Sequence, residues 1–246
     1  MYYKTEGLVL RETEYKDADK LLTVLTKDRG QVTLRARGVR SKNSPLKSGC
    51  QLLAYSEFTV FEGRTATVNE AVPICLFLPL RENIEQLALA SYFAQIAELL
   101  SQEDSPDSEL LYLCLYALQA LCEKKQPQKL LKAAFEFRAV CLAGYAPALD
   151  GCMECGNSAP DFFQVSAGTL ICAGCRPEGH TGLRLPVHPG TLDAMRHVSQ
   201  CRINRLFSFQ LGEQSTKEFC GIAETYLLTQ LEYSFFTLDF YKSLFI

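Results

Sequence analysis

Four of the eleven cysteines stand in two closely spaced pairs, Cys152-x₂-Cys155 and Cys172-x₂-Cys175. Each Cys-x₂-Cys pair forms a tight knuckle that directs two sulfur atoms to one point, and the sixteen residues between the pairs suit a short hairpin. Four thiolates complete a tetrahedral Zn²⁺ shell and leave no position for a catalytic water. The spacing therefore predicts one structural zinc ion held by Cys152, Cys155, Cys172 and Cys175.

Two alternatives to a zinc site are weaker. Accidental pairing of reduced thiols requires no metal, and a redox-active Cys-x₂-Cys pair requires a thioredoxin-like βαβ context that this segment lacks. His180 is an alternative ligand, but it lies beyond the second pair and is better interpreted as part of a surface loop. Because the segment has little apolar material of its own, we expect the metal to contribute its local folding energy.

The other seven cysteines are isolated within apolar segments. Thiols stay reduced in the cytosol, and a single cysteine in such a segment behaves as a small apolar side chain. We therefore expect core positions for Cys50, Cys75, Cys114, Cys122, Cys141, Cys201 and Cys220.

A second group of chemically suited residues is a cluster of cations near the N-terminus. Residues 1–49 contain eleven Lys and Arg against six Asp and Glu, although the complete chain has a net charge of −3. A polyanion is attracted by the local field of one face and not by the total charge. Candidate contacts to a phosphate backbone are Arg35, Arg37, Arg40, Lys42 and Lys47.

The spacing of these cations suggests how they are presented. Arg35 and Arg37 are two residues apart, so on a strand they project from one face. The hydroxyl groups of Ser41 and Ser44 add hydrogen-bond donors for phosphate oxygens. A charged strand face is also a common solvated surface, so the charges alone leave DNA binding as a hypothesis. The aromatic side chains available for base stacking are Tyr3, Tyr15 and Tyr55.

The sequence contains no arrangement that is typical of a catalytic centre. It has no Gly-x₄-Gly-Lys-[Ser/Thr] loop for nucleotide hydrolysis and no Gly-x-Gly-x₂-Gly after a strand. The three histidines have no evident Ser or Cys nucleophile as a partner, and Asp17-x-Asp19 is better interpreted as a turn than as a metal site. We therefore expect a protein that is not an enzyme.

The residues before position 80 alternate in the manner of β-strands. Apolar residues recur at every second position in five short runs, near Leu8, Leu22, Val32, Phe58 and Val68. Turn-forming residues separate the runs. Five strands in about 75 residues have the dimensions of a small barrel, either an OB-fold or an SH3-like barrel, and periodicity does not decide between them.

After Pro79 the apolar period becomes helical, first over residues 84–99. Ser105-Pro106 predicts the start of a second helix, with the serine as the cap and the proline in the first turn. Three further helices are expected: one from Pro127 to about residue 144, one from Pro189, and a long last one that begins at a cap on Ser215.

These elements predict an α+β multidomain fold. A small N-terminal β-barrel, of the OB-fold or the SH3-like type, is expected over residues 1–80, and it is followed by an α-helical domain whose first part spans 81–149. A Cys₄ zinc ribbon-like insertion is expected over 150–185, and the second part of the helical domain over 186–246.

The distribution of apolar residues argues against secretion and membrane insertion. Residues 1–6 lack an apolar stretch behind a basic start, which a signal peptide requires. The most apolar run, Leu110 to Cys122, is too short to cross a bilayer. We expect a cytoplasmic protein that has no membrane partner.

The order of these parts resembles the bacterial RecO family of recombination mediators. The resemblance covers essentially the whole chain, and its most specific piece is the Gly-x-Arg-Ser-Lys segment at residues 38–42. The matching residues are Thr5–Leu10, Thr26 with Gly30, Ala36–Lys42 with Ser44 and Leu46, Phe135-Glu136, Gly144–Pro147, the four paired cysteines and Lys242-Ser243.

The resemblance implies a DNA repair protein of the nucleoid that has no catalytic chemistry. Members of the family have an N-terminal OB-fold, a helical domain and a zinc ribbon-like insertion. They bind single- and double-stranded DNA, anneal complementary strands, associate with RecR and contact the C-terminal tail of single-stranded DNA-binding protein, which helps RecA to load. Carried to the matching positions, Arg37, Arg40 and Lys42 contact DNA and the four cysteines hold zinc.

One region departs from the family pattern. Some relatives place arginines directly before the Phe-Glu pair, where the acidic tail is received, but this chain has Ala133 and Ala134 there. The nearest charges are Lys132 and Arg138, so no residue is assigned to the tail. The alternative function is a non-enzymatic protein-interaction scaffold whose OB-type barrel binds an acidic protein partner. A steep loss of DNA affinity with salt distinguishes a DNA-binding protein from such a scaffold.

Overall fold

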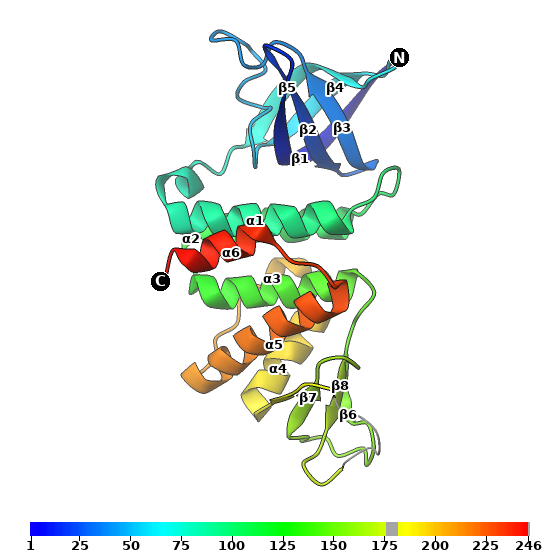
Figure 1. Ribbon diagram of the computed structural model, residues 1–246, viewed down its shortest axis with the longest axis vertical. Coiled ribbons are helices and arrows are strands. Elements are labelled where there is room, and N and C mark those ends of the chain that lie inside the picture. The colour runs from blue at the N-terminus through cyan, green and yellow to red at the C-terminus, as the bar shows by residue number, and fades with distance from the viewer. Residues whose placement is uncertain (176–181, 246) are drawn as a thin grey trace. The chain divides into compact units, whose positions relative to one another are not determined.

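The computed structural model describes residues 1–175 and 182–245 of the chain (Figure 1). The chain forms two compact units, one made of Met1–Glu123 with Phe235–Ile246 and the other of Lys124–Ser234. The first unit contains a β-barrel with helices, and the second contains helices with a small sheet. The predicted α+β class is confirmed, whereas the expected domain boundaries at residues 80, 149 and 185 stay predictions.

Five strands of the first unit close into a barrel in the order β1-β2-β3-β5-β4. Neighbouring strands are antiparallel except β3 and β5, which run parallel and meet at Arg35 and Thr67. This five-stranded closure is the OB-fold topology, so it decides between the two barrels that periodicity left open. The strands are β1 (Tyr2–Tyr15), β2 (Asp19–Thr26), β3 (Gly30–Ala36), β4 (Tyr55–Phe61) and β5 (Thr67–Cys75).

The barrel closes around side chains from alternate positions of its strands. On β4, Phe58 and Val60 point inward and are fully buried, as the alternation predicts. The segment 37–54, which connects β3 to β4, adds Leu46 and Cys50 to the same core. Because this segment contributes to the core, its backbone is fixed against the barrel and its polar side chains are presented outward.

The turn between β2 and β3 requires glycine at position 30. Gly30 has a φ of +65°, and a Cβ atom there would collide with the carbonyl oxygens of Gln102 and Ser105. Thr26 closes the turn because its hydroxyl donates to the Gly30 carbonyl oxygen at 2.7 Å. The missing side chain therefore lets this hairpin rest directly on the backbone that follows α1 (Ile84–Leu100).

Three α-helices accompany the barrel in the first unit, and α1 lies across one end of it (Figure 1). Asn83 caps α1 because its side chain accepts a hydrogen bond from the backbone N–H of Gln86 at 3.0 Å. The C-terminal helix packs against α1, where the rings of Phe235 and Tyr92 meet edge to face at 5.4 Å. The other elements are the 3₁₀ turn η1 (Leu78–Glu82), α2 (Ser108–Glu123) and α6 (Phe236–Ser243).

The second unit packs a small sheet against helices. The rings of Phe137 on α3 and Phe219 on α5 meet at 5.7 Å, and Phe163 of the sheet contacts Tyr226 of α5 at 5.1 Å. The segment that the sequence indicates only as loop-rich contains four short strands in the order β6-β8-β7-β9. The elements are α3 (Gln128–Leu142), β6 (Ala148–Cys152), β7 (Phe162–Gln164), β8 (Thr169–Ile171), β9 (Arg184–Pro186), α4 (Pro189–Gln200), η2 (Ile203–Arg205) and α5 (Glu213–Leu231).

Two details of the helix predictions are wrong. The cap of α2 is Asp107 and not Ser105, because the Asp107 carboxylate accepts a hydrogen bond from Leu110 N at 2.9 Å. Helix α5 begins before Ser215 and is followed by α6, so it is not the last helix. Helix α6 was not predicted, because it is short and buries only Leu238 and Tyr241.

The isolated cysteines occupy the predicted core positions only in part. Cys50 and Cys114 are buried, whereas the other five isolated cysteines are half-buried, and all eleven cysteines are free thiols.

Within the described part of the chain, no helix combines the length and the hydropathy that crossing a membrane requires.

Asp107→Ala is expected to destabilise the first turn of α2 by about 1 kcal/mol, because it removes the acceptor of the Leu110 N–H. Amide hydrogen exchange of Leu110 in the intact chain measures this effect, and a loss of about 1 kcal/mol accelerates exchange roughly fivefold. Ser105→Ala is the matched control, since it removes a hydroxyl just outside the helix start. Equal acceleration in both variants would contradict the cap.

Candidate metal centre and nucleic-acid interface

The four paired cysteines converge in the second unit. All four Sγ atoms lie within 4.8 Å of one another, and those of Cys155 and Cys172 are 3.8 Å apart. Sulfur atoms at about 2.3 Å from a tetrahedral zinc ion stand about 3.8 Å apart along each edge of the tetrahedron. The predicted convergence is confirmed, and the donor set fits a Zn²⁺ ion.

Short strands bring the two cysteine pairs together. Strands β7 and β8 form the hairpin between the pairs that the spacing predicts. Cys152 ends β6, and its Sγ accepts a hydrogen bond from the backbone N–H of Cys172 at 3.4 Å. Gly156, with a φ of +72°, turns the chain just after the first pair. His180, the alternative ligand, lies outside the described residues.

Hydrogen bonds shift the pKa values of Cys152 and Cys175 in opposite directions. Backbone N–H groups, first that of Cys155, lower the pKa of Cys152 to about 6. The pKa of Cys175 rises to about 12, chiefly because of its hydrogen bond with the Cys155 sulfur. Four neighbouring thiolates repel one another, and a divalent cation removes this cost because it binds the deprotonated sulfur atoms. The arrangement therefore favours a bound metal.

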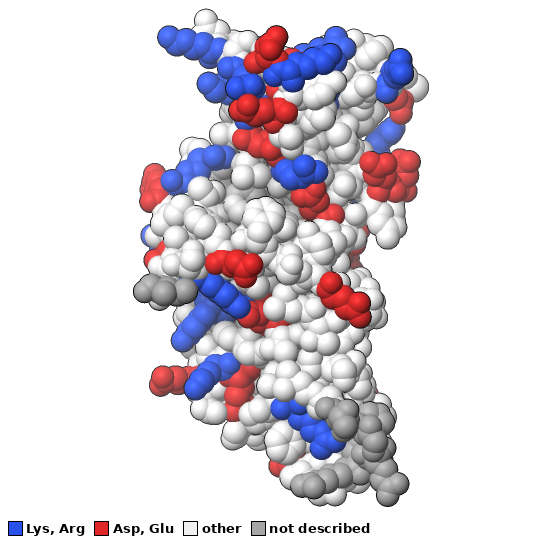
Figure 2. Space-filling model, in the orientation of Figure 1, with Lys and Arg blue, Asp and Glu red and all other residues white. Residues whose placement is uncertain are grey.

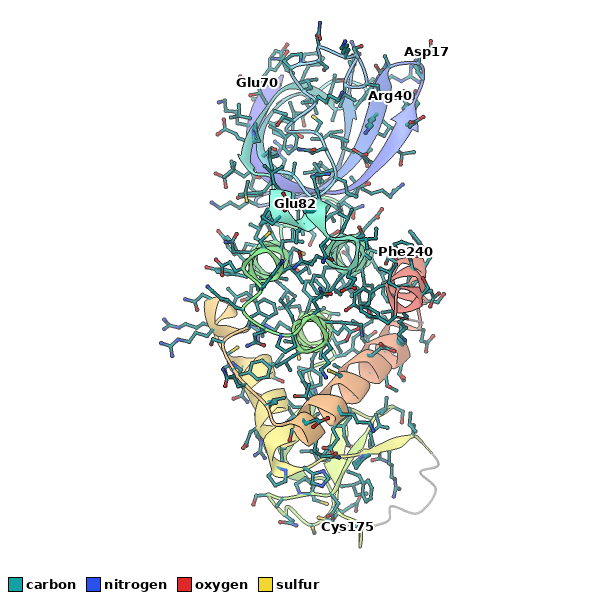
Figure 3. The ribbon with its side chains drawn as sticks, turned by 90° about the vertical axis from the view of Figure 1, so that its left-hand side faces the viewer. Asp17, Arg40, Glu70, Glu82, Cys175 and Phe240 are labelled. Carbon is teal, nitrogen blue, oxygen red and sulfur yellow. The ribbon has the colours of Figure 1, made fainter. Side chains whose placement is uncertain are left out.

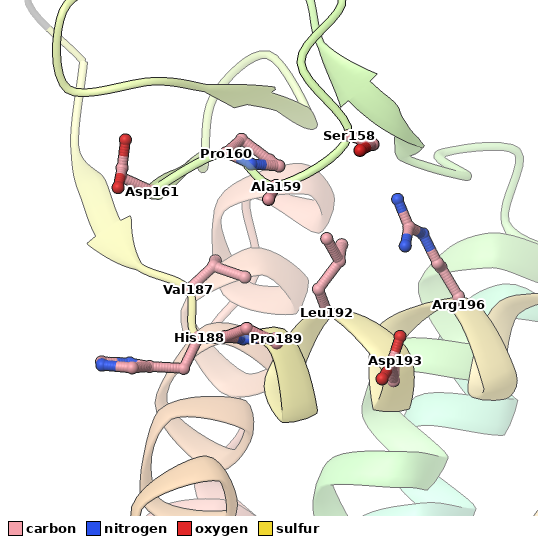
Figure 4. A pocket seen from close by; sticks show the side chains of 10 residues that line it. All are labelled: Ser158, Ala159, Pro160, Asp161, Val187, His188, Pro189, Leu192, Asp193 and Arg196. Carbon is pink, nitrogen blue, oxygen red and sulfur yellow. The ribbon is translucent and has the colours of Figure 1, made fainter.

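A cleft of about 340 Å³ lies beside the cysteine cluster within the second unit (Figure 4). One wall is the segment 158–161 between the cysteine pairs, and the other is the start of α4. Arg196 tethers the helix to β6, because its guanidinium donates to the carbonyl oxygen of Leu149 at 2.9 Å. Ser158 and His188 lie on opposite walls, and His188 Nδ1 contacts the Glu218 carboxylate. The serine and the histidine do not form a catalytic pair.

In the first unit, the cationic segment after β3 docks on the turn between β1 and β2. The backbone N–H of Arg40 donates to the Ala18 carbonyl oxygen at 3.0 Å, and its guanidinium reaches Glu14 at 3.2 Å. Figure 3 shows Arg40 and Asp17 at the same end of the barrel. The two segments, 16–18 and 37–47, therefore form one surface, which we call the turn surface.

Asp19 fixes the start of the cationic segment. Its carboxylate accepts a hydrogen bond from Gly38 N at 2.8 Å and pairs with the Arg35 guanidinium at 2.6 Å. These contacts, the Gly38 hydrogen bond first, hold the pKa of Asp19 below its usual range. Because β3 ends at Ala36, Arg37 lies in the turn. The expectation that Arg35 and Arg37 share a strand face is therefore wrong.

The five candidate cations divide into two groups. Arg35 and Arg40 are ion-paired with acidic residues of β2 and β1. Arg37, Lys42 and Lys47 are exposed, and no ion pair is found for them within residues 1–175 and 182–245. Figure 2 shows basic and acidic side chains interleaved over this end of the barrel. The first group therefore positions the turn surface, and the second is available to an external anion.

The three candidate tyrosines have different surroundings. Tyr3 packs against the barrel core and lies beneath the Arg29 guanidinium, whose carbon is 3.8 Å from the ring centre. Tyr55 donates a hydrogen bond of 2.7 Å to a carboxylate of β1. Tyr15 is 36% exposed, and the Arg35 guanidinium lies 5.3 Å from its ring centre. Tyr15 is therefore the one of the three that is open to an external base.

Two features of the barrel's binding loops, Asp19 and Arg64, were not predicted from the sequence. From the sequence, Asp19 is predicted to be a turn residue. Its role as the anchor of the cationic segment can be seen only once it is known that this segment folds back onto Asp19. Arg64 is exposed in the loop between β4 and β5, where the sequence indicates only a turn. The loops between β1 and β2 and between β4 and β5 are the binding loops of OB-folds. That rule is the signal that could have identified Arg64.

Lys132 and Arg138, the charges nearest the Phe-Glu pair, are engaged within the second unit. Lys132 Nζ lies 2.7 Å from carboxylate oxygens of both Glu136 and Glu224. Burial alone would lower the pKa of Lys132, but the two carboxylates outweigh it and raise the pKa. The Arg138 guanidinium donates to the Ser199 carbonyl oxygen. Both side chains are therefore engaged by neighbours within the second unit, and neither is assigned to the acidic tail.

An OB-type barrel followed by helices and a four-thiol cluster defines a class of multidomain protein with a metal-binding insertion. The family model described as recombination protein O N terminal matches residues 1–77, and that described as recombination protein O C terminal matches residues 81–237. The chain belongs to the RecO family.

Individual relatives match over most of the chain. DNA repair protein RecO of Acetivibrio thermocellus is 31% identical over 246 residues, which are 99% of this chain and 97% of the relative. DNA repair protein RecO of Rubrobacter xylanophilus is 33% identical over 201 residues, which are 80% of each chain. DNA repair protein RecO of Moorella thermoacetica is 31% identical over 224 residues, 86% of this chain and 82% of the relative. These relatives agree with the resemblance that the motifs indicate.

Removal of metal with a chelator is expected to unfold the cysteine segment and to leave the barrel folded, because the four cysteines lie in the second unit and the barrel core lies in the first. Hydrogen exchange should rise in residues 150–175 and stay unchanged in residues 2–75. Cys155→Ser should have the same effect, and Cys201→Ser, outside the cluster, is the control. Purified protein with far less than one zinc per chain would contradict the metal centre.

Proposed function

We propose that this chain is a DNA repair and recombination mediator that binds single- and double-stranded DNA, anneals complementary strands and has no catalytic chemistry. The observation that carries the proposal is the turn surface, which presents Arg37, Lys42 and Lys47 beside a binding loop of an OB barrel. Each cation that neutralises a phosphate releases counterions, so such a surface gains affinity for any DNA sequence. Arg35 and Arg40 support it by holding the turn.

Annealing follows from the same electrostatics. Two complementary strands repel each other, and cations that neutralise phosphates on both strands reduce this repulsion while the bases search for register. Outside residues 1–49 the chain is acidic, with 22 Asp and Glu against 14 Lys and Arg. This distribution discourages DNA from spreading over the remaining surface and concentrates binding on the barrel.

We extend the proposal to partners and location through the family. The proposed protein partners are RecR and the C-terminal tail of single-stranded DNA-binding protein. The proposed outcome is that RecA loads onto DNA that is covered by single-stranded DNA-binding protein. The site of action is the bacterial nucleoid in the cytoplasm. No residue is assigned to the acidic tail, because Lys132 and Arg138 have partners of their own.

We also propose that the cysteine cluster holds one structural zinc ion. Cys152, Cys155, Cys172 and Cys175 would bind it, and the ion would supply folding energy to the segment between α3 and α4. With four sulfur ligands it has no open position, so its proposed role is confined to the shape of the second unit.

The triple variant Arg37→Ala/Lys42→Ala/Lys47→Ala is expected to weaken binding to all DNA sequences alike. On single strands, the slope of the logarithm of the binding constant against the logarithm of the salt concentration should become less steep by about 0.7 for each lost phosphate contact. The measurement is fluorescence anisotropy of labelled oligonucleotides over a range of salt. The matched control removes three other cations, Lys4, Arg11 and Lys217, of which the first two are paired with acids. DNA affinity that stays normal in the first variant would exclude the turn surface and favour the scaffold function.

Strand annealing tests the proposed function directly. The native chain is expected to accelerate the pairing of complementary oligonucleotides, both bare and coated with single-stranded DNA-binding protein, and the triple variant is expected to lose this acceleration. The readout is the quenching of a dye pair placed on the two strands. Absence of annealing by the native, zinc-loaded chain would contradict the function itself.

A further inference from the structure

An exposed aromatic pair lies at the other binding loop of the barrel. The rings of Tyr2 and Phe61 are 5.1 Å apart with an interplanar angle of 57°, and the two side chains are 59% and 44% exposed. Large apolar rings at a strand end cost free energy when they remain in water. The pair sits where β1 begins and β4 ends, and neither ring belongs to the barrel core.

The backbone dictates this exposure. On β4 the even-numbered residues Phe58 and Val60 point inward, so Phe61 must point outward. Gly63 follows in the loop, and a Cβ atom there would lie 2.8 Å from the Phe61 ring. The ring therefore rests against the loop backbone on one side and on Tyr2 on another. This support fixes the pair and leaves its outer surface open.

The strand register connects this pair to the turn surface. Tyr2 is opposite Phe61, Phe61 is opposite Thr67, and Thr67 is opposite Arg35, so these residues form one row across β1, β4, β5 and β3. Strands are spaced about 4.8 Å apart, so the row extends about 14 Å from Tyr2 to Arg35. By register the row continues from Arg35 to Leu21 and Thr13. Tyr15 lies two residues beyond Thr13 on β1, and its ring centre is 5.3 Å from the Arg35 guanidinium.

The charges along the row favour a polyanion over an apolar protein surface. Arg64, in the loop beside Phe61, is exposed and has no ion pair among the described residues. At the other end of the row, Arg35 is paired with Asp19, and its guanidinium lies 5.3 Å from the Tyr15 ring centre. The acidic neighbours are engaged: Glu62 lies 3.5 Å from Arg29, and Glu57 lies 2.9 Å from Lys4. Aromatic faces next to available cations are the combination with which proteins hold single strands.

We infer that Tyr2 and Phe61 form a second base-stacking station in addition to Tyr15, so that one single strand crosses the barrel from Tyr15 to this pair, with a phosphate near Arg64. This inference rests on the proposed function and adds a property to it. Bases in a duplex are already stacked on each other, whereas unpaired bases can stack on the rings. The pair therefore supplies preference for single strands, while Arg37, Lys42 and Lys47 act on both kinds of DNA.

Tyr2→Ala/Phe61→Ala tests the station in the intact, zinc-loaded chain. Stacking contributes about 1–3 kcal/mol per base, so the double variant is expected to lose at least roughly fivefold in affinity for a thymidine oligonucleotide of about 12 nucleotides. Affinity for a duplex of equal length should change less than about twofold. Tyr2→Phe/Phe61→Tyr retains both rings and is expected to bind normally. Tyr116→Ala/Phe240→Ala removes an equally exposed pair elsewhere in the first unit and is the matched control.

A fluorescence measurement gives an answer that does not depend on the stability of the alanine variant. The chain has no tryptophan, so Phe61→Trp introduces a single reporter. Stacked thymine should quench its emission with the same midpoint as binding, and duplex should not. Unchanged single-strand affinity of the alanine variant together with an unquenched tryptophan would overturn the station while native binding persists. Loss of all DNA binding by the native chain would instead reject the proposed function.

Discussion

The first unit depends on the closure of its barrel at Arg35. The backbone N–H of Arg35 donates to the Ala66 carbonyl oxygen at 2.8 Å, and the residue is the point where β3 meets β5. Its side chain pairs with Asp19, which also holds Gly38. One residue thus joins β3 to β5, which closes the barrel, and contacts the acidic residue that holds the cationic segment. A barrel left open here would have two free strand edges and no fixed turn surface.

Charge distribution explains how an acidic protein is suited to DNA. Two of the five candidate cations, Arg35 and Arg40, are paired with acidic neighbours in this fold, and their contribution is positional. The remaining three, Arg37, Lys42 and Lys47, lie on the segment 37–54 that joins β3 to β4, where the core fixes the backbone and leaves these side chains exposed. Net charge therefore carries little information about binding, whereas the location of unpaired charge carries much.

The second unit is organised by a different principle. Its sheet consists of very short strands, and the four sulfur atoms converge at positions that range from buried to exposed. Contacts such as those of Phe163 with Tyr226 and of Arg196 with Leu149 attach this segment to α5 and α4. A metal ion at the cluster would stabilise the segment that forms one wall of the adjoining cleft.

The five strands, the positions of α1, α3 and α4, and the convergence of the cysteines could all be predicted from the sequence, because each depends on periodicity or spacing within one short segment. The family could also be identified, through motifs that extend along the chain. Periodicity left the OB topology open, and only the family resemblance implied it, whereas the Asp107 cap, the role of Asp19 and the row from Tyr2 to Arg35 emerge only when the chain is folded. These features depend on which distant segments become neighbours, and local pattern does not contain that information. Arg35 and Arg37 show the difference, because a spacing of two residues predicts a common face only where the strand continues, and here it ends between them.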